Sequence, residues 1–230
     1  MVIKMKFYLI NGSPRKKYNT AKILDSTSHA ITEEYKKHQL QEKLEVETIN
    51  LYDLDYKGCK SCFHCKKIEG KYYGNCPIKD DLRELLPKIW DCDGLIIASP
   101  IYFANITGQT RSFLERLLFP KYVYGDKTLA KPKPTAFIYT MNVKKEFSDQ
   151  QYPQAIYDNI ERFIKYTFKN LETLKVYDTY QFKDYTLYEN YLFNEEEKKQ
   201  QQINQFPKDL EAAYNLGVKI FKQAMEVKNG

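Results

Sequence analysis

The stretch GLIIASPIYFANITGQTRSFLERLL, residues 94–118, decides the fold class. It begins with an unbroken apolar run, Gly94–Ala98, and ends in a helical pattern formed by Phe113, Leu114, Leu117 and Leu118. An apolar run without alternation predicts a strand buried on both faces of a parallel sheet, and a spacing of three or four residues predicts a helix. A buried strand followed by an amphipathic helix is the repeating unit of a doubly wound α/β fold.

The same unit recurs along the chain. Apolar runs also occur at Phe7–Ile10 and Thr135–Tyr139, with weaker runs at Val46–Leu51 and Leu174–Tyr180. Two further helical stripes lie nearer the C-terminus, one of Ile156, Ile160, Phe163, Ile164 and Thr167, the other of Leu210, Ala213, Tyr214, Gly217, Ile220, Phe221 and Ala224. These stripes predict faces that pack on the core and have no chemical role. Five strands alternating with five helices predict one domain over residues 1–230, because parallel neighbours need helical crossovers.

Composition argues against several classes of protein. Apolar residues make up 43% of the 230 residues and aromatic residues 15%, which is enough for a large core. Lys and Arg outnumber Asp and Glu by 36 to 30, but the two signs are interleaved, and a nucleic-acid-binding surface needs clustered positive charge. The apolar run near the N-terminus is too short for a signal peptide or a membrane span. We therefore expect a cytoplasmic protein with neither a nucleic-acid nor a membrane partner. Within the polar stretch at residues 185–206, the run NEEEKKQQQ, residues 194–202, is expected to be solvated surface.

The loop after the first strand has the features of a phosphate site. Its sequence is NGSPRKKYNT, residues 11–20, in which Gly12 permits an unusual turn and Arg15 supplies a cation. Asn19 or Thr20 is expected to cap a helix that begins near Ala21, whose free N–H groups and positive dipole end attract a phosphate. The loop lacks the GxGxxG and GxxxxGK patterns of nucleotide-binding folds. An ordinary capped strand-to-helix loop would have a similar composition, so both interpretations stay open.

The loop after the third strand suits a flat ligand. Pro100 and Tyr102 stiffen the chain where it leaves the sheet, and Ile101 and Phe103 add apolar surface. Backbone groups as far as Gly108 remain free to bond a planar heterocycle such as a flavin ring. Open α/β sheets bind ligands at the carboxyl ends of the strands between which the strand order reverses. A loop of the core could contain the same residues, so this loop is not decisive by itself.

Taken together, the two loops resemble a known family. GSPR with a later NT after the first strand, and SPIYF with a later SFLER after the third, are similar to the NADPH-dependent FMN reductase group of the flavodoxin-like superfamily. The intervening GCxxCxxC, GxC and DD, between Gly58 and Asp81, resemble its iron-sulfur flavoprotein branch. The resemblance covers Lys6–Arg116. It implies an FMN cofactor and a flavodoxin-like α/β fold, a doubly wound five-stranded parallel sheet of order 2-1-3-4-5 with helices on both faces.

The resemblance also implies which residues bind FMN. The phosphate is expected to contact Ser13, Arg15, Asn19 and Thr20. The ring is expected to lie against Pro100, Ile101, Tyr102 and Phe103, with its edge covered by Thr140, Met141 and Asn142. The last assignment departs from the family pattern, which often has a glycine at the end of the fourth strand. The cofactor performs the chemistry in such enzymes, so no side chain is assigned as a catalytic acid or base.

Four cysteines form a motif in a loop insertion at about residues 52–80. The motif is a C-x2-C-x2-C run of Cys59, Cys62 and Cys65, followed after ten residues by Cys76 and a proline. This spacing is typical of a 4Fe–4S cluster, although the ten-residue gap is wider than iron-sulfur flavoproteins usually show. A zinc site and free thiols are the alternatives, and free thiols are the preferred interpretation. Cys92 stands apart and is expected to be a buried, inert thiol.

The leading hypothesis is an FMN-dependent NAD(P)H oxidoreductase that passes electrons to a quinone, a flavin or another small acceptor. One alternative is an iron-sulfur flavoprotein in ferredoxin-linked electron transfer. Another is a non-enzymatic flavodoxin-like carrier or binding module, but such carriers are usually acidic, whereas the net charge here is +6. The histidines, His29, His38 and His64, form no hydrolytic or metal-binding pattern. We expect a homo-oligomer, a dimer or tetramer, with the aromatic residues of segment 119–127 as either a dimer contact or an internal flap.

Overall fold

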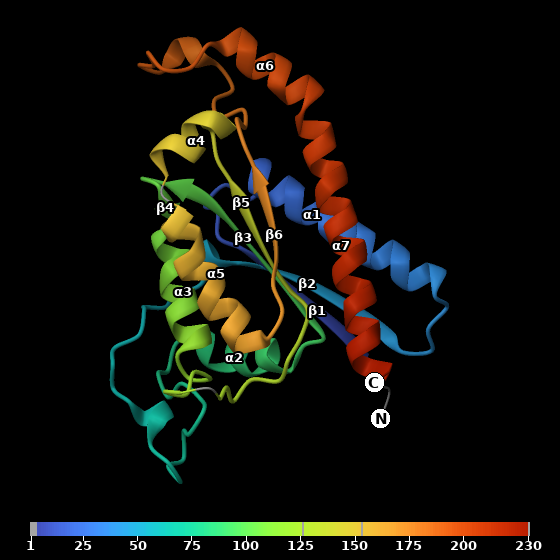
Figure 1. Cartoon of the computed structure of the whole chain (residues 1–230), viewed down its shortest axis with the longest axis vertical. Coiled ribbons are helices and arrows are strands. Elements are labelled where there is room, and N and C mark those ends of the chain that lie inside the picture. The colour runs from blue at the N-terminus through green and yellow to red at the C-terminus, as the bar shows by residue number, and fades with distance from the viewer. Residues whose placement is uncertain (1–3, 126, 153, 230) are drawn as a thin grey trace.

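A parallel β-sheet forms the centre of the protein (Figure 1). The structure is a computed structural model and describes residues 4–125, 127–152 and 154–229. The strands that run parallel are β1 (Lys4–Asn11), β2 (Lys43–Asn50), β3 (Gly94–Tyr102), β5 (Thr135–Thr140) and β6 (Glu172–Val176), in the order β2-β1-β3-β5-β6. A two-residue strand, β4 (Asn105–Ile106), pairs antiparallel with the end of β3. The flavodoxin-like order 2-1-3-4-5 is thereby confirmed, with β4 as a small addition beside it.

Helices cover both faces of the sheet (Figure 1). One face carries α1 (Asn19–Lys37) and α7 (Phe206–Asn229), which pack against each other. The other face carries α2 (Leu82–Asp91), α3 (Gly108–Leu118) and α5 (Gln154–Phe168). Two short helices, α4 (Lys145–Gln151) and α6 (Glu195–Asn204), lie beyond the carboxyl ends of β5 and β6. Single 3-10 turns occur at Leu51–Asp53, His64–Lys66 and Tyr185–Leu187, and none of the described helices is long and apolar enough to cross a membrane.

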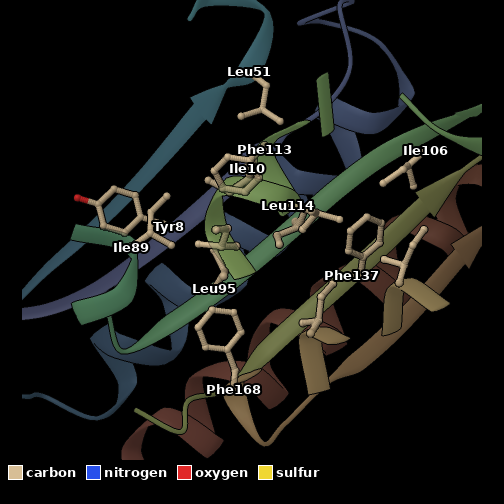
Figure 2. Close-up of a cluster of buried hydrophobic side chains, with 14 of the residues drawn as sticks. Tyr8, Ile10, Leu51, Ile89, Leu95, Ile106, Phe113, Leu114, Phe137 and Phe168 are labelled. Atoms are coloured by element: carbon tan, nitrogen blue, oxygen red, sulfur yellow. The ribbon is translucent and has the colours of Figure 1, made fainter. Parts of the chain in front are cut away.

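Alternate residues of each central strand enter opposite halves of the core. Phe7 and Leu9 of β1 pack with side chains of α1 and α7, whereas Tyr8 and Ile10 belong to the cluster that α2, α3 and α5 cover, shown in Figure 2. All of β5 is buried, and so is β3 from residue 94 to residue 101. β2 and β6 are the edges of the sheet and have partly exposed side chains. Their exposure explains the weaker apolar runs in their sequences, since only strands buried on both faces are continuously apolar.

α1 and α7 approach each other closely at Gly217. A Cβ atom at this position would lie 2.5 Å from the backbone oxygen of Thr27 and 2.8 Å from Cβ of Ala30. Both distances are shorter than van der Waals contact, so a side chain here would push the helices apart. The Thr27 hydroxyl also donates to the Ala213 carbonyl at 3.2 Å. This contact fixes α1, and with it the loop that precedes α1, relative to the rest of the protein.

Three sequence predictions were wrong in detail. The fifth strand ends at Val176 rather than at Tyr180, because the chain beyond it bonds to the loop after β5. Phe163, expected on the core face of α5, is 41% exposed because it lines a cleft between α3 and α5. The run NEEEKKQQQ, residues 194–202, expected to be solvated, forms most of α6 and is largely exposed, but its Lys198 is buried. Lys198 donates to the Asp178 carboxylate and to a carbonyl after β5, so a charged residue fastens α6 to the end of the sheet.

Candidate functional site

The loop between β1 and α1 gathers the residues expected to hold a phosphate. Ser13, Asn19 and Thr20 are buried in it. The Ser13 hydroxyl accepts a hydrogen bond from the Arg15 N–H at 3.1 Å, and the Ser13 N–H donates to the side chain of Asn11 at 3.0 Å. Side-chain oxygens that bond to backbone N–H groups two residues away stabilise tight turns. The four predicted phosphate ligands therefore share one loop of defined shape at the carboxyl end of β1.

The helix after this loop begins earlier than expected and lacks a side-chain cap. α1 starts at Asn19, and its N-cap residue is Tyr18, whose side chain makes no capping hydrogen bond within the described chain. The prediction that Asn19 or Thr20 caps the helix was therefore wrong, because both residues belong to its first turn. The first N–H groups of a helix have no partner inside it, and together with the helix dipole they attract anions. An uncapped helix start beside the Arg15 cation has the chemistry of a phosphate site.

Gly12 brings this loop into backbone contact with the end of β3 and the start of α3. The Gly12 N–H donates to the Ala98 carbonyl at 2.8 Å, and the Gly12 carbonyl accepts from the Thr107 hydroxyl at 2.9 Å. A Cβ atom at Gly12 would lie 2.0 Å from Oγ1 of Thr110 and 2.9 Å from the Ala98 oxygen. The two ligand loops can therefore meet only because residue 12 has no side chain.

A buried hydroxyl network, which the sequence analysis missed, joins the two loops. Ser99, Thr107 and Thr110 are all buried. Thr107 caps α3 by accepting from the Thr110 N–H at 3.3 Å, and the Thr107 N–H donates to Oγ of Ser99 at 3.1 Å. A threonine directly before a helical pattern signals an N-cap, so the role of Thr107 could have been inferred from ITGQT. Its bond to Gly12 could not, because that bond links residues 95 positions apart.

β3 and β4 form a hairpin that exposes Phe103. The turn residues Phe103 and Ala104 have φ angles of +48° and +59°. This left-handed region costs a non-glycine residue about 1–2 kcal/mol, and such strain persists only where the surrounding structure imposes it. Phe103 is fully exposed and Tyr102 is 40% exposed, whereas Pro100 and Ile101 are buried. Of the four residues expected to line a flavin ring, Tyr102 and Phe103 offer side-chain surface.

Arg15, in the first ligand loop, affects Tyr102, in the second. Burial raises the pKa of the Tyr102 phenol, and the charge of Arg15 opposes the shift. The hydrogen bonds of Gly12 to Ala98 and Thr107 join the loop expected to hold the phosphate to the loop expected to hold the ring.

The three residues at the end of β5 have different surroundings. Thr140 faces the first loop, and its hydroxyl lies 2.7 Å from that of Thr20. Met141 is buried; its N–H donates to the carbonyl of Val176, the last residue of β6, at 2.9 Å, and its carbonyl accepts from the Thr179 N–H at 3.0 Å. Asn142 donates from its side-chain amide to the side chain of Gln181. Of the three, Thr140 is thus the residue whose side chain directly contacts the expected phosphate loop.

The segment after β6 completes the surroundings of this loop. The Arg15 guanidinium donates to the Gln181 carbonyl at 2.8 Å, and the Asn19 side chain donates to the Tyr180 carbonyl at 2.9 Å. The buried ion pair between Lys198 and Asp178 holds the same segment. The sequence carries no signal for these contacts, since any residue can supply a backbone carbonyl.

The cysteine loop brings its four motif cysteines to one small pocket. This pocket lies beside the end of α3 and is lined by Cys59, Cys62, Cys65 and Cys76. Burial raises the pKa of the Cys65 thiol, Lys66 opposes the shift, and the other three thiols add to it. No three His, Cys, Asp or Glu side chains of the described residues lie close enough to ligate one metal ion. A 4Fe–4S cluster does not need three side chains around one metal ion, because each of its four cysteines binds a different iron.

A buried arginine and two residues with a left-handed backbone lie beside the pocket. Arg116, whose side chain is 1% exposed, donates to Sγ of Cys76 at 3.1 Å and to both oxygens of Asp80 at 2.7 and 3.0 Å. Ser61 and Phe63 have φ angles of +52° and +54°. Backbone N–H groups around such left-handed residues form concave donor sites that are common at iron-sulfur centres. The pocket itself is small, with a volume of about 10 Å³.

Cys92 lies apart from this pocket and is buried as expected. Its thiol donates to the carbonyls of Ile89 and Gly94 at 3.1 and 3.2 Å. The ammonium of the buried Lys133 donates to three carbonyls here, those of Ile89, Trp90 and Cys92, at 2.6–2.9 Å. These bonds close the C-terminal end of α2, which gives Lys133 and Cys92 a structural role.

Comparison with known families agrees with this geometry. The family model of the NADPH-dependent FMN reductases matches residues 5–153. The chain belongs to the NADPH-dependent FMN reductase family. The match includes both ligand loops and the cysteine loop of this FMN reductase family member. It ends before β6, so Tyr180, Gln181 and Lys198 lie outside the matched range.

Curated relatives of this family member include iron-sulfur flavoproteins. One, from Methanocaldococcus jannaschii, is 38% identical over 112 residues, which is 49% of this chain and 51% of the relative. Another, from Archaeoglobus fulgidus, is 39% identical over 114 residues, which is 49% of this chain and 48% of the relative. The chain spans about half the length of the curated relatives it matches.

Solved structures with the same fold include two oxidoreductases. An NAD(P)H:quinone oxidoreductase from Methanothermobacter marburgensis has a TM-score of 0.64 at 13% identity, covering 94% of this chain and 96% of the other. An azoreductase from Bacillus anthracis has a TM-score of 0.63 at 12% identity, covering 94% and 99%. At such identities the likeness establishes the fold of this FMN reductase family member and nothing further.

Proposed function

We propose that the protein is an FMN-dependent oxidoreductase that takes electrons from NAD(P)H and passes them to a small acceptor such as a quinone or a flavin. The observation that carries the proposal is that the uncapped helix start and the Arg15 cation adjoin a loop that Gly12 joins to Ala98 and Thr107, at the carboxyl ends of β1 and β3. The strand order reverses between these strands, which is where open α/β sheets bind ligands. Residues 1–230 would act as one FMN-binding domain with the cysteine loop, at about residues 52–80, as an insertion.

The first loop fits the phosphate of FMN. Ser13 and Thr20 supply buried hydroxyl groups, the first turn of α1 supplies N–H donors, and Arg15 supplies a charge-assisted bond. The side-chain amide of Asn19 is directed to the Tyr180 carbonyl, so Asn19 would orient the loop and its N–H would face the phosphate. A site built on one helix start, with the Arg15 cation beside it, suits a terminal phosphate rather than a dinucleotide. FMN fits this loop better than FAD for that reason.

The second loop fits the flavin ring. Tyr102 and the exposed Phe103 offer flat apolar surface, and the backbone of the hairpin offers donors and acceptors. When bound, FMN would supply the hydride-accepting chemistry between the nicotinamide donor and the acceptor. The raised pKa keeps the Tyr102 phenol protonated at neutral pH, so it is able to donate a hydrogen bond. Thr140 would position the phosphate loop through its contact with Thr20.

A titration of the purified protein with flavins tests this function. FMN is expected to bind at least tenfold more tightly than riboflavin, because one charge-assisted bond alone contributes about 1.5–3 kcal/mol. The FMN-loaded protein is expected to oxidise NADH or NADPH when a soluble quinone is present. Equal affinity for FMN and riboflavin would refute the phosphate site. An FMN-loaded protein that oxidises neither nicotinamide would refute the enzymatic activity while leaving the binding site intact.

We also propose that the protein assembles as a homo-oligomer, a dimer or tetramer. The fully exposed Phe103, held outward by a strained turn, supports this proposal. Large aromatic side chains are enriched in protein interfaces, where the partner subunit covers them. Light scattering of the wild-type protein and of Phe103→Ser would test it. A monomeric wild-type protein at micromolar concentration would contradict it.

A second candidate function is favoured by the cysteine pocket. Four thiols, a buried guanidinium and left-handed backbone turns converge there, and this combination suits an anionic 4Fe–4S cluster. The names of the curated relatives support the same assignment. In this case the protein would be an iron-sulfur flavoprotein, and ferredoxin-linked single-electron transfer would reach the flavin through the cysteine loop. Iron and sulfide analysis of anaerobically purified protein decides between cluster and free thiols, since a cluster requires about four irons per chain.

A further inference from the structure

The cleft that Phe163 lines lies between α3, α5 and the segment that follows α3. It has a volume of about 550 Å³, within the usual range for sites that bind small molecules. Four aromatic residues line it, Phe119, Tyr122, Tyr124 and Phe163, together with aliphatic side chains of α3 and α5. The cleft is therefore a mostly apolar cavity with flat walls.

The walls of this cleft are held in place by contacts within the chain. The ring of Tyr122 lies 5.5 Å from that of Tyr124, 6.1 Å from that of Phe163 and 5.2 Å from that of Tyr166. The Tyr166 hydroxyl bonds to two carbonyls of the segment at 2.6 Å, and the Lys66 ammonium bonds to the carbonyls of Phe119 and Tyr122. These bonds favour the internal flap over the dimer contact as the role of segment 119–127. A preformed wall of this kind lowers the entropic cost of ligand binding.

One end of the cleft is polar. The side chain of Arg111 is 60% exposed there, and its Nε lies 3.6 Å from Oε1 of Glu115, which is longer than a good hydrogen bond. The other Glu115 oxygen accepts from the backbone N–H of Cys59 at 3.1 Å, which holds the carboxylate toward the cysteine loop. The Arg111 guanidinium is thus available to donate to an acceptor group of a bound molecule.

We propose that this cleft is a second ligand site, which binds a planar aromatic molecule with a carbonyl acceptor group. The rings would stack on Phe163 and meet Tyr122 edge to face, because these two side-chain rings are inclined at 72° to each other, and the carbonyl would accept from Arg111. At a rise of 1.5 Å per residue, Phe119 at one end of the cleft lies about 18 Å along the axis of α3 from Thr107, which caps α3 at the flavin loops. Cys59 lines both this cleft and the cysteine pocket, so the bound molecule would lie beside the cysteine loop. The inference does not depend on the proposed flavin site.

Calorimetric titration with anthraquinone-2-sulfonate tests the site. This probe is flat and soluble and carries ring carbonyls, and the Phe163 and Arg111 variants distinguish the cleft from a quinone site at the flavin loops. Phe163→Ala is expected to weaken binding about tenfold and Arg111→Gln about threefold. The matched controls are Phe147→Ala, which removes a half-exposed aromatic ring of α4, and Lys165→Gln, which removes a charge from the exposed face of α5. Both controls are expected to bind within about twofold of the wild type.

Three results would overturn the proposal. The first is the absence of saturable binding to the wild-type protein. The second is binding that the Phe163 and Arg111 variants leave unchanged, which would place the probe elsewhere. The third is a dimer that Phe163→Ala converts to a monomer, which would show that a second copy of the chain covers the cleft.

Discussion

Replacing Gly12 by alanine tests the idea that backbone contact between the two ligand loops requires a residue without a side chain. The added Cβ would lie 2.0 Å from Oγ1 of Thr110 and 2.9 Å from the Ala98 carbonyl oxygen. The first contact can be relieved by rotating a side chain, but only by breaking the hydroxyl network at the start of α3. The second involves backbone of the central strand, so it moves the loop itself.

The magnitude follows from two opposing effects. Overpacking a dense site costs about 1–3 kcal/mol, and replacing glycine by alanine returns about 0.4–1 kcal/mol through the lower entropy of the unfolded chain. The net expectation for Gly12→Ala is a loss of about 1–2 kcal/mol in the free energy of unfolding. For a chain of this length, that loss corresponds to a fall in Tm of about 3–6 °C. FMN affinity is expected to fall as well, because the phosphate loop is displaced.

Urea unfolding and flavin titration, with two further variants, check this expectation. Gly108→Ala is the matched control, because a Cβ atom there meets no described atom within 4 Å, and its stability is expected to be equal to or above that of the wild type. Combining Gly12→Ala with Thr110→Ala removes the 2.0 Å contact but keeps the 2.9 Å contact with Ala98, so it should recover only part of the loss. A Gly12→Ala protein as stable as Gly108→Ala, with unchanged FMN affinity, would refute the reasoning.

Three further predictions concern the phosphate loop, the cysteines and α6. Ser13→Ala combined with Arg15→Ala is expected to lower FMN affinity at least tenfold in calorimetry and to leave riboflavin affinity unchanged; an equal loss for both flavins would place the phosphate elsewhere. If the second candidate function holds, replacing the three cysteines of the C-x2-C-x2-C run by serine should abolish iron binding in anaerobically purified protein. FMN affinity should change less than about threefold. Iron retained by this variant would show that these cysteines are not its ligands. Lys198→Met leaves the Asp178 carboxylate buried without its cation and should lower the free energy of unfolding in urea by about 3 kcal/mol. Lys199→Met, at an exposed position, should lower it by less than about 0.5 kcal/mol. Equal effects would show that the buried pair does not stabilise the protein.

The central strands could be predicted from the sequence because their physical signals are local, whereas their order followed from the resemblance to the flavodoxin-like superfamily. A strand buried on both faces must be apolar throughout, and Gly94–Ala98 and Thr135–Tyr139 show this directly. Strand ends were less predictable. The fifth strand stops at Val176 because the next residues bond to the loop after β5, which lies far away in the sequence. Phe163 fits the helical period of a core face, yet the space opposite it is a cleft.

The candidate site also has features that could be predicted from the sequence and features that could not. The NGSPR and SPIYF loops were found from their sequences, because residue types that turn the chain, bind phosphate or stack on a ring are specific. The helix start at Asn19 and the deep burial of Met141 were not predictable from those residue types. They depend on packing with β6 and its following segment, which lies beyond the motifs.

The sequence alone therefore determined which strands are central and which two loops are candidates for binding a flavin, because each depends on the chemistry and spacing of neighbouring residues. Only the tertiary structure decided how the loops meet. Gly12 against Thr110, Arg15 at the Gln181 carbonyl, and four cysteines around one pocket beside Arg116 all join segments distant in the chain. Such contacts depend on distances between backbones that no local pattern records, and backbone carbonyls carry no residue-specific signal.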